Sequence, residues 1–415
     1  MYIFITITLI IGGIAFVFNL LWCLYLSFSK SVQQESYDYQ QRSFETMLLF
    51  IPAMNEYKSL NKNMSKLLNL HEQCKHFIDL KFVFIDDASN DGTTELLNKF
   101  SHEENVIVIH RVKPNAQLGK GPALQNAADQ IAQMNFSRDN TLIGVVDADA
   151  RFDENYLCKV WHSFENSSYD LVQTRVNIYN TDNNLSTMQN FEFSIYNGLV
   201  QMARTNWGSS LASGNGQFVT LKMVEDVGWS SSLLEDCEFS LKGLLKGYYG
   251  TFLNTDSIGQ EGVISLKKLI RQRIRWCQGG LQCLATYGSK IIKSSTISFA
   301  IKFYVLAFLL IPCFSVFLVP AAIFSLITLF YDAAFNFWLS IGAILVIVLI
   351  EYFSNSLMIV KQWRTTEQES KITFLKLLKV AFVIDLYRWV LAVVPYMAIA
   401  RMLTGNNSWE KTSHS

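Results

Sequence analysis

The 415-residue chain has few charged side chains and no net charge. Lysine and arginine together number 35, as do aspartate and glutamate, and charged residues make up only 17% of the sequence. Nucleic-acid-binding proteins usually carry net positive charge or a basic stripe, so this balance argues against that class. A disordered chain is also excluded, because such chains are poor in hydrophobic residues, which are 50% here.

The seven cysteines are odd in number, and none of them belongs to a Cys-x-x-Cys pair. This spacing excludes a zinc ribbon and a disulfide-bonded scaffold. We therefore expect mostly buried free thiols in a reducing compartment.

Charge is absent from two long stretches, Met1–Phe28 and Phe303–Phe330, each long enough to cross a bilayer. The first lacks the basic start and the small-residue cleavage site of a signal peptide, so a retained helix is expected. A third stretch, Ala333–Val360, is interrupted only by Glu351. The basic segment after it, Lys361–Lys379, is expected to lie on the cytoplasmic face as an interfacial helix.

The last apolar segment, Val380–Ala400, contains Asp385 and Arg388. Charges at that depth are costly unless they pair or face a cavity. A salt bridge between the two, three positions apart on a helix, is the favoured interpretation. The alternative places them, with Glu351, along a path for a polymer. The side of the membrane on which the C-terminus lies stays open.

Between Ser29 and about residue 295 no segment is long and apolar enough to span a membrane, so a single cytoplasmic domain is expected there. The expected division is a membrane helix at 1–28, this domain at 29–295, membrane and interface helices at 296–402 and a tail at 403–415. Inside the domain, apolar runs at 47–51, 82–85, 106–109 and 142–146 alternate with helical patterns. Such alternation predicts an α/β fold with a parallel sheet wrapped by helices.

Acidic residues stand directly after two of the expected strands. Asp86 and Asp87 end the second, and Asp147 and Asp149 follow the fourth. Ligands of parallel α/β sheets bind beyond the carboxyl ends of the strands, where these acids would lie. Two carboxylates one residue apart suit Mg²⁺ or Mn²⁺, which prefer oxygen ligands and are often shared with substrate phosphates.

Further polar residues lie at the starts of expected helices. Pro52 ends the first strand, and Glu56 after it is either a nucleoside contact or a first-turn helix acid. Glycines flank Lys120, which allows close backbone approach to a phosphate, although the P-loop spacing is absent. Asp91 and Thr93 are interpreted as a helix cap.

Two motifs in the second half suit group-transfer chemistry. Asp236 stands at a predicted helix start and is either a general base or a cap. Gln272, Arg275 and Trp276 follow at fixed spacing. The guanidinium can neutralise a leaving diphosphate, and the indole can stack on a sugar. The alternative is an interfacial belt of aromatic and basic residues.

Taken in order, these motifs resemble the family 2 glycosyltransferases, and more narrowly membrane-integrated processive synthases such as cellulose, hyaluronan and poly-N-acetylglucosamine synthases. The motifs run from about Met47 to Gly280 and read PAMNE, DDASNDGT, GKGPAL, DAD, SGNGQF, EDCEF and QRIRWCQGG. The tail Trp409-Glu410-Lys411-Thr412 also resembles the W-x-K-T ending of some members. Leu234 departs from the usual threonine, and a single helix precedes the domain where several synthases have two.

The resemblance implies a GT-A (Rossmann-like) fold inserted between membrane helices, a nucleotide-sugar donor, expected to be UDP-linked, and Mg²⁺ or Mn²⁺. It implies that Asp236 is the catalytic base, that Asp149 holds the metal, and that Asp147 contacts the nucleotide or the metal. The residues expected to bind the nucleotide-sugar are Pro52, Glu56, Asp86, Asp87, Lys120, Asp147, Gln272, Arg275 and Trp276. The residues expected near the sugar and the acceptor are Ser213, Gly214, Asn215, Gly216, Glu235 and Trp276.

The expected function is an inverting β-glycosyltransferase of a bacterial plasma membrane, which polymerises the donor sugar into an extracellular or capsular polysaccharide and guides it across the bilayer. One alternative is a single transfer to a membrane lipid. A catalytically silent membrane scaffold is the non-enzyme alternative, and the complete acidic set argues against it. The expected partners are the donor, a growing glycan or lipid acceptor, and membrane lipid, with no nucleic acid; a homo-oligomer is left open.

Overall fold

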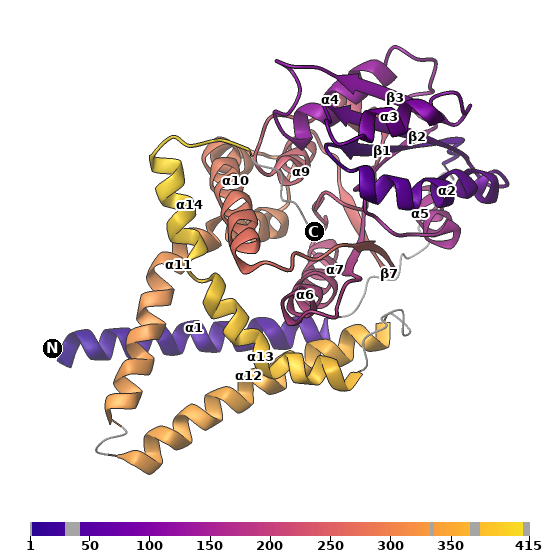
Figure 1. Ribbon diagram of the computed structural model, residues 1–415. Coiled ribbons are helices and arrows are strands. Elements are labelled where there is room, and N and C mark those ends of the chain that lie inside the picture. The colour runs from indigo at the N-terminus through magenta and orange to yellow at the C-terminus, as the bar shows by residue number, and fades with distance from the viewer. Residues whose placement is uncertain (1, 30–41, 333–335, 366–373, 410–415) are drawn as a thin grey trace.

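The computed structural model describes residues 2–29, 42–332, 336–365 and 374–409. A seven-stranded sheet forms the centre of the α/β domain (Figure 1). Its strands are β1 (Thr46–Ala53), β2 (Asp79–Asp87), β3 (Val106–Arg111), β4 (Thr141–Val145), β5 (Leu171–Ile178), β6 (Gln217–Thr220) and β7 (Gly250–Gln260). Their order across the sheet is β3-β2-β1-β4-β6-β5-β7.

The four strands expected from the apolar runs are confirmed, and they pair in parallel. The whole sheet is mixed, because β6, which was not among the four expected strands, runs antiparallel to both of its neighbours. The reason lies in where this strand begins. Gln217 lies opposite Val145, the last residue of β4, so the chain enters β6 at the carboxyl edge of the sheet and has to run back.

Helices cover both faces of the sheet and continue toward the membrane segments. They are α2 (Tyr57–Cys74), α3 (Thr93–Phe100), α4 (Lys120–Ile131), α5 (Glu154–Glu165), α6 (Asn184–Asn190), the π-helical η1 (Phe191–Asn197), α7 (Gly198–Asn206), α8 (Leu221–Val227), α9 (Glu235–Leu245) and α10 (Leu266–Lys293). Strand β1 shows why two cores form. Its side chains alternate, so that Leu49 and Ile51 pack under α2 and α5 while Leu48 and Phe50 pack under α4 and α8.

Five apolar helices complete the described chain: α1 (Tyr2–Phe28), α11 (Phe299–Asp332), α12 (Phe337–Thr365), α13 (Phe374–Leu391) and α14 (Val394–Leu403). Four segments, 10–28, 299–331, 340–365 and 378–403, are long and apolar enough to cross a membrane. The packing of α1 against α11 and α12 joins the first helix to the later ones (Figure 1).

The segment after α12 differs from the separate interfacial helix expected over 361–379. Residues 361–365 continue α12, 374–379 begin α13, and 366–373 lie outside the described residues. The last apolar segment is also divided, because α13 ends at Leu391 and α14 begins at Val394. Pro395, in the first turn of α14, has no N–H to continue a helix from the preceding turn.

Both ends of the α13–α14 segment lie against the α/β domain. At the end of α12, Gln362 donates to the side chain of Asn254 on β7 at 2.8 Å. Beyond α14, the carbonyl of Asn406 accepts from Gln278 of α10, also at 2.8 Å. The chain therefore returns to the domain, where Trp409 lies against the start of α4.

Candidate active site

A cavity of about 200 Å³ opens at the carboxyl ends of β1, β2 and β4. Most of the residues expected to bind donor, acceptor or metal line it. These are Pro52, Glu56, Asp87, Lys120, Asp147, Asp149, Ser213, Gly214, Asn215, Glu235, Asp236, Gln272, Arg275 and Trp276. Asp86 and Gly216 are not among its lining residues.

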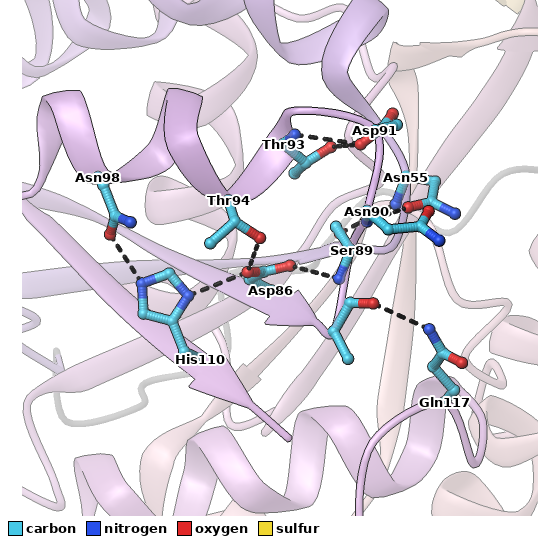
Figure 2. Close-up of polar contacts among 11 residues, drawn as sticks. Asn55, Asp86, Ser89, Asn90, Asp91, Thr93, Thr94, Asn98, His110 and Gln117 are labelled. Atoms are coloured by element: carbon cyan, nitrogen blue, oxygen red, sulfur yellow. Dashed lines mark hydrogen bonds and ion pairs between the residues drawn. The ribbon is translucent and has the colours of Figure 1, made fainter. Parts of the chain in front are cut away.

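The side chain of Asp86 is used inside the loop that joins β2 to α3 (Figure 2). It accepts hydrogen bonds from the backbone of Ser89 at 3.1 Å and the hydroxyl of Thr94 at 2.6 Å, and it pairs with His110 at 3.0 Å. Burial alone would raise the pKa of Asp86, but these hydrogen bonds outweigh it and lower the pKa. Asp86 thus holds the loop, and its neighbour Asp87 faces the cavity.

Asp87 forms a buried ion pair with Arg111, the last residue of β3, and accepts from the backbone of Gln117 at 3.0 Å. Burial raises the pKa of Asp87, and the two partners offset only part of that effect. Arg111 was not among the residues expected at the site. The signal for it is its register, because it lies directly opposite Asp87 in the sheet.

Asp91 and Thr93 lie at the start of α3 as expected, although the N-cap position itself is Gly92. A carboxylate oxygen of Asp91 accepts from both the backbone and the hydroxyl of Thr93, at 3.1 and 2.6 Å (Figure 2). The hydroxyl of Thr93 in turn accepts from the backbone of Glu56 at 2.9 Å. This chain of bonds ties the end of β1 to the start of α3, and so fixes one wall of the cavity.

Asp147 and Asp149 form the wall beyond β4. Asp147 is ion-paired with Lys120 at 2.6 Å, and its backbone donates to the side chain of Asn215 at 3.1 Å. The charges of Asp147 and nearby acids outweigh the effect of burial and raise the pKa of Lys120. Asp149 accepts from the backbone of Glu261 at 2.8 Å.

These two carboxylates suit a cation that is shared with the donor. Within the described residues, no three His, Cys, Asp or Glu side chains converge on a point that could hold a metal. Mg²⁺ is commonly held by one or two carboxylates together with substrate phosphates, and Asp147 and Asp149 supply such a pair on the cavity wall. The ammonium of Lys120 lies on the same carboxylate, where it too can meet a phosphate.

The loop at 213–216 passes directly over Asp236. A Cβ on Gly214 would lie 3.2 Å from a carboxylate oxygen of Asp236 and 3.9 Å from the ammonium of Lys120. Gly214 also has φ +85°, a conformation that side chains disfavour. The glycine therefore allows the backbone of the loop to approach the carboxylate closely on the wall of the cavity.

The ionisation of Asp236 suits a general base. Burial, and next the charge of Glu235, raise its pKa to about 7, while Lys120 and Arg275 oppose the shift. A general base works best when its pKa lies near the working pH. The carboxylate also accepts from the backbone of Cys237 at 2.6 Å in the first turn of α9, so it serves the start of the helix while it lines the cavity.

A buried glutamine behind the loop was missed from the sequence. Gln173 on β5 accepts from the backbone of Ser213 at 2.8 Å and donates to the carbonyl of Asn215 at 2.9 Å. A Cβ on Gly216 would lie 2.3 Å from the hydroxyl of Thr174, so this glycine permits the close packing of the loop on β5. No motif marks Gln173, because its role depends on the loop at 213–216, which is distant in sequence.

Helix α10 places Gln272, Arg275 and Trp276 on the cavity wall. Its close approach depends on Gly279, where a Cβ would lie 2.7 Å from the backbone nitrogen of Leu234. The helix thus packs on the residues that immediately precede Asp236 on α9. Burial lowers the pKa of Arg275, and the charges of Glu235 and Asp236 oppose this effect. The guanidinium has the planar donors that match the oxygens of a phosphate group.

Trp409 also lines the cavity, next to Gly119 at the start of α4. The sequence drew attention to this residue only through the W-x-K-T resemblance. The other residues of that tail, Glu410, Lys411 and Thr412, lie outside the described part of the chain.

The mixed sheet with an acidic cavity at its carboxyl edge has the GT-A architecture of nucleotide-sugar-dependent glycosyltransferases. The chain belongs to glycosyltransferase family 2. The family model described as "Glycosyl transferase family group 2" matches residues 142–354, just over half of the chain. The model described as "Glycosyl transferase family 2" matches residues 49–228.

Two curated relatives illustrate the range of products. The chain is 27% identical over 257 residues to a beta-monoglucosyldiacylglycerol synthase of Trichormus variabilis, covering 61% of this chain and 53% of that one. It is 25% identical over 273 residues to a poly-beta-1,6-N-acetyl-D-glucosamine synthase of Staphylococcus aureus, covering 63% and 61%. The chain spans about half the length of the first of these and somewhat more of the second.

Among solved structures, the mannosyltransferase PcManGT from Pyrobaculum calidifontis, in complex with GDP-Man and Mn²⁺, superposes with a TM-score of 0.62. The alignment covers 96% of this chain and 99% of that one at 14% identity. At this identity the similarity establishes the shared fold and no more.

Proposed function

We propose that the chain transfers a sugar from a nucleotide donor to a hydroxyl group of a membrane-held acceptor, with inversion at the anomeric carbon. One observation carries this proposal. The carboxylate of Asp236, with a pKa of about 7, lies in the same cavity as the Asp147–Asp149 pair and Arg275. One cavity thus combines a candidate base, two carboxylates that can hold a cation, and a positive charge. These are the groups that transfer from a nucleotide-sugar requires.

In the proposed reaction, Asp236 takes the proton of the acceptor hydroxyl as its oxygen bonds to the anomeric carbon. The bond from that carbon to the diphosphate breaks, and its electron pair leaves with the nucleoside diphosphate. Lys120 and Arg275 offset the charge that develops there. A divalent cation, when bound, would supply further charge stabilisation at the diphosphate. An α-linked donor would then give a β-linked product.

The donor is proposed to be UDP-linked, as the resemblance implies. The complex of the mannosyltransferase relative contains GDP-Man and Mn²⁺, so both nucleotides and both cations belong in a test. We also propose that the α/β domain lies on the cytoplasmic side of the plasma membrane, since the basic segment at 361–379 is expected on that side.

Two proposals differ in the acceptor, which is either a membrane lipid or a growing polysaccharide. A second cavity, of about 350 Å³, shares Ser213, Leu234, Asp236 and Trp276 with the first and continues along apolar side chains to α11. This apolar continuation favours a lipid acceptor and a single transfer. The match to a poly-beta-1,6-N-acetyl-D-glucosamine synthase over 63% of the chain favours polymerisation, the second candidate.

Proteoliposomes containing the full chain are incubated with radiolabelled UDP- and GDP-sugars and Mn²⁺ or Mg²⁺, and the products are sized. A single glycolipid supports the lipid acceptor, and a ladder supports polymerisation. Asp236→Asn is expected to abolish transfer while nucleotide binding persists. Turnover at the wild-type rate in this variant would refute its role as base. If no donor is hydrolysed or transferred by the wild-type chain, the silent scaffold becomes the better account.

A further inference from the structure

The second cavity contains a cation without a counter-ion. Arg204 on α7 lines it, and no carboxylate in the described part of the chain pairs with its guanidinium. Its side-chain hydrogen bond to Gln201 is long, at 3.4 Å. The guanidinium otherwise lies over the rings of Phe308, at 4.6 Å from the centroid, and Tyr304, at 5.8 Å.

The two acids that line this cavity, Glu192 and Asp236, lie beside other cations. Glu192 pairs with Arg273 at 2.8 Å and accepts from Tyr387 at 2.7 Å, and Asp236 lies beside Lys120 at the donor end. Burial lowers the pKa of Arg204, which reflects the cost of removing this charge from water. Contacts with aromatic faces offset part of that cost, and an anion beside the guanidinium would offset more of it.

We propose that Arg204 binds the phosphate group of an anionic phospholipid acceptor, whose headgroup hydroxyl is presented to Asp236. The inference rests on the proposed function, and it names the class of acceptor. Arg204 and Asp236 line one cavity of about 350 Å³, so a single lipid headgroup in that cavity can present its phosphate to one and its hydroxyl to the other. A guanidinium is well suited to this role, because its planar donors match the oxygens of a phosphate.

The rest of the cavity suits acyl chains. Its far end is formed by Phe308, Leu309, Ile311 and Pro312 of α11, within the segment 299–331 that is apolar enough to cross a membrane. Pro312 cannot donate to the carbonyl four residues before it, that of Phe308, so the helix is weakened where it borders the cavity. A lipid can therefore place its headgroup between Arg204 and Asp236 and its chains along α11.

The transfer step is that of the proposed function. The headgroup hydroxyl loses its proton to Asp236, its oxygen forms the glycosidic bond, and the nucleoside diphosphate leaves with the electron pair. The phosphate at Arg204 is unchanged, so no further reactant is needed. Arg204 acts on the binding of the acceptor, and it leaves the donor site at β1, β2 and β4 unaltered.

The test compares two acceptors in vesicles of phosphatidylcholine: phosphatidylglycerol, which has a phosphate and headgroup hydroxyls, and diacylglycerol, which has a hydroxyl but no phosphate. Arg204→Met is expected to raise the KM for phosphatidylglycerol by roughly 10- to 100-fold, the usual effect of losing a hydrogen bond to a charged group. The KM for the donor and the transfer to diacylglycerol are expected to stay as in the wild type. Arg204→Lys should recover part of the affinity, since it restores the charge but not the planar fork.

Arg138→Met is the matched control, because Arg138 is paired with Glu225 and Asp226 away from the cavity. It should not change the KM of either acceptor. An equal loss of transfer to both acceptors in Arg204→Met, or a wild-type chain that does not prefer phosphatidylglycerol, would overturn the inference while the proposed function stands. Absence of donor hydrolysis and transfer with every acceptor in the wild type would refute the proposed function itself.

Discussion

The charge of Glu235 provides a sharp test of the proposed base. Glu235 precedes Asp236 at the start of α9, and both carboxylates line the donor cavity. Its charge is the second cause, after burial, of the raised pKa of Asp236. Glu235→Gln removes this charge with little change of shape, so the pKa of Asp236 must fall, although burial keeps it above the ordinary value of an aspartate.

The expected shift follows from the physics of neighbouring charges. A like charge at such close range raises the pKa of a carboxyl group by roughly one to two units. Each unit corresponds to about 1.4 kcal/mol between the two protonation states. Since a base acts only when ionised, the rate falls below its pKa, and kcat/KM of the wild-type chain should decline as the pH drops below about 7. In Glu235→Gln the decline should begin at least about one pH unit lower.

The assay is the initial rate of sugar transfer from pH 5 to 9 at low donor concentration, with the position of the acid limb as the readout. Because Glu235 lines the cavity, Glu235→Gln can also change the maximal rate. The pH at which the rate begins to fall is measured independently of that maximum. Glu238→Gln is the control, because this carboxylate lies on the same helix but bonds Ser230 and Tyr287 outside the cavity. An acid limb that stays in place in Glu235→Gln, or moves to higher pH, would refute Asp236 as the titrating base.

Three further outcomes are expected. Gly279→Ala should lower both Tm and kcat, because the added methyl group would overpack against Leu233 and Leu234 at a cost of about 1–3 kcal/mol. Gly288→Ala is the control and should change neither value, because its methyl group would meet only the tip of the Leu284 side chain. Unchanged Tm and kcat in Gly279→Ala would contradict the observed packing of α10. Trp409→Ala should weaken nucleotide binding in a fluorescence titration, and an unchanged affinity would place the indole outside the donor site. Chelation by EDTA should abolish transfer and Mn²⁺ should restore it; full activity in EDTA would count against a cation at Asp147 and Asp149.

Much of the fold could be predicted because its signals are local. Each of the first four strands contains a short apolar run, and each expected run lies inside its strand to within one residue. The acids that end β2 and follow β4 are brought to one edge because parallel strands share a direction, which made Asp87, Asp147 and Asp149 predictable as neighbours.

The remainder depends on contacts between distant parts of the chain. Strand β6 is reversed because the loop at 213–216 brings the chain to the carboxyl edge of the sheet. Arg111 reaches Asp87 through the register of β3 on β2. Gln173 bonds the backbone of Ser213, which lies 40 residues away in sequence. Asp86 and Asp87 look equivalent in sequence, yet the alternation of a strand points them in opposite directions. Only Asp87 therefore lines the cavity.

The salt bridge expected between Asp385 and Arg388 is present at 2.8 Å. Both residues also line a separate cavity of about 760 Å³ among α1, α11, α12 and α13, together with Glu351. The salt bridge is thus confirmed, and the path for a polymer stays a prediction, because most of the side chains that line this cavity are apolar.

The return of the chain to Trp409 bears on the side of the membrane on which the C-terminus lies. The segment 378–403 is long and apolar enough to cross a membrane, yet the chain lies against the α/β domain both at Gln362, near the end of α12, and at Asn406, beyond α14. We therefore expect the residues beyond α14 to lie on the same side of the membrane as that domain. An impermeant thiol reagent should therefore label a cysteine placed at Asn407 only from the face that exposes the catalytic domain. One continuous stretch of chain runs from α13 through α14 to Trp409 in the candidate active site, so a ligand that displaces Trp409 would also displace these apolar helices.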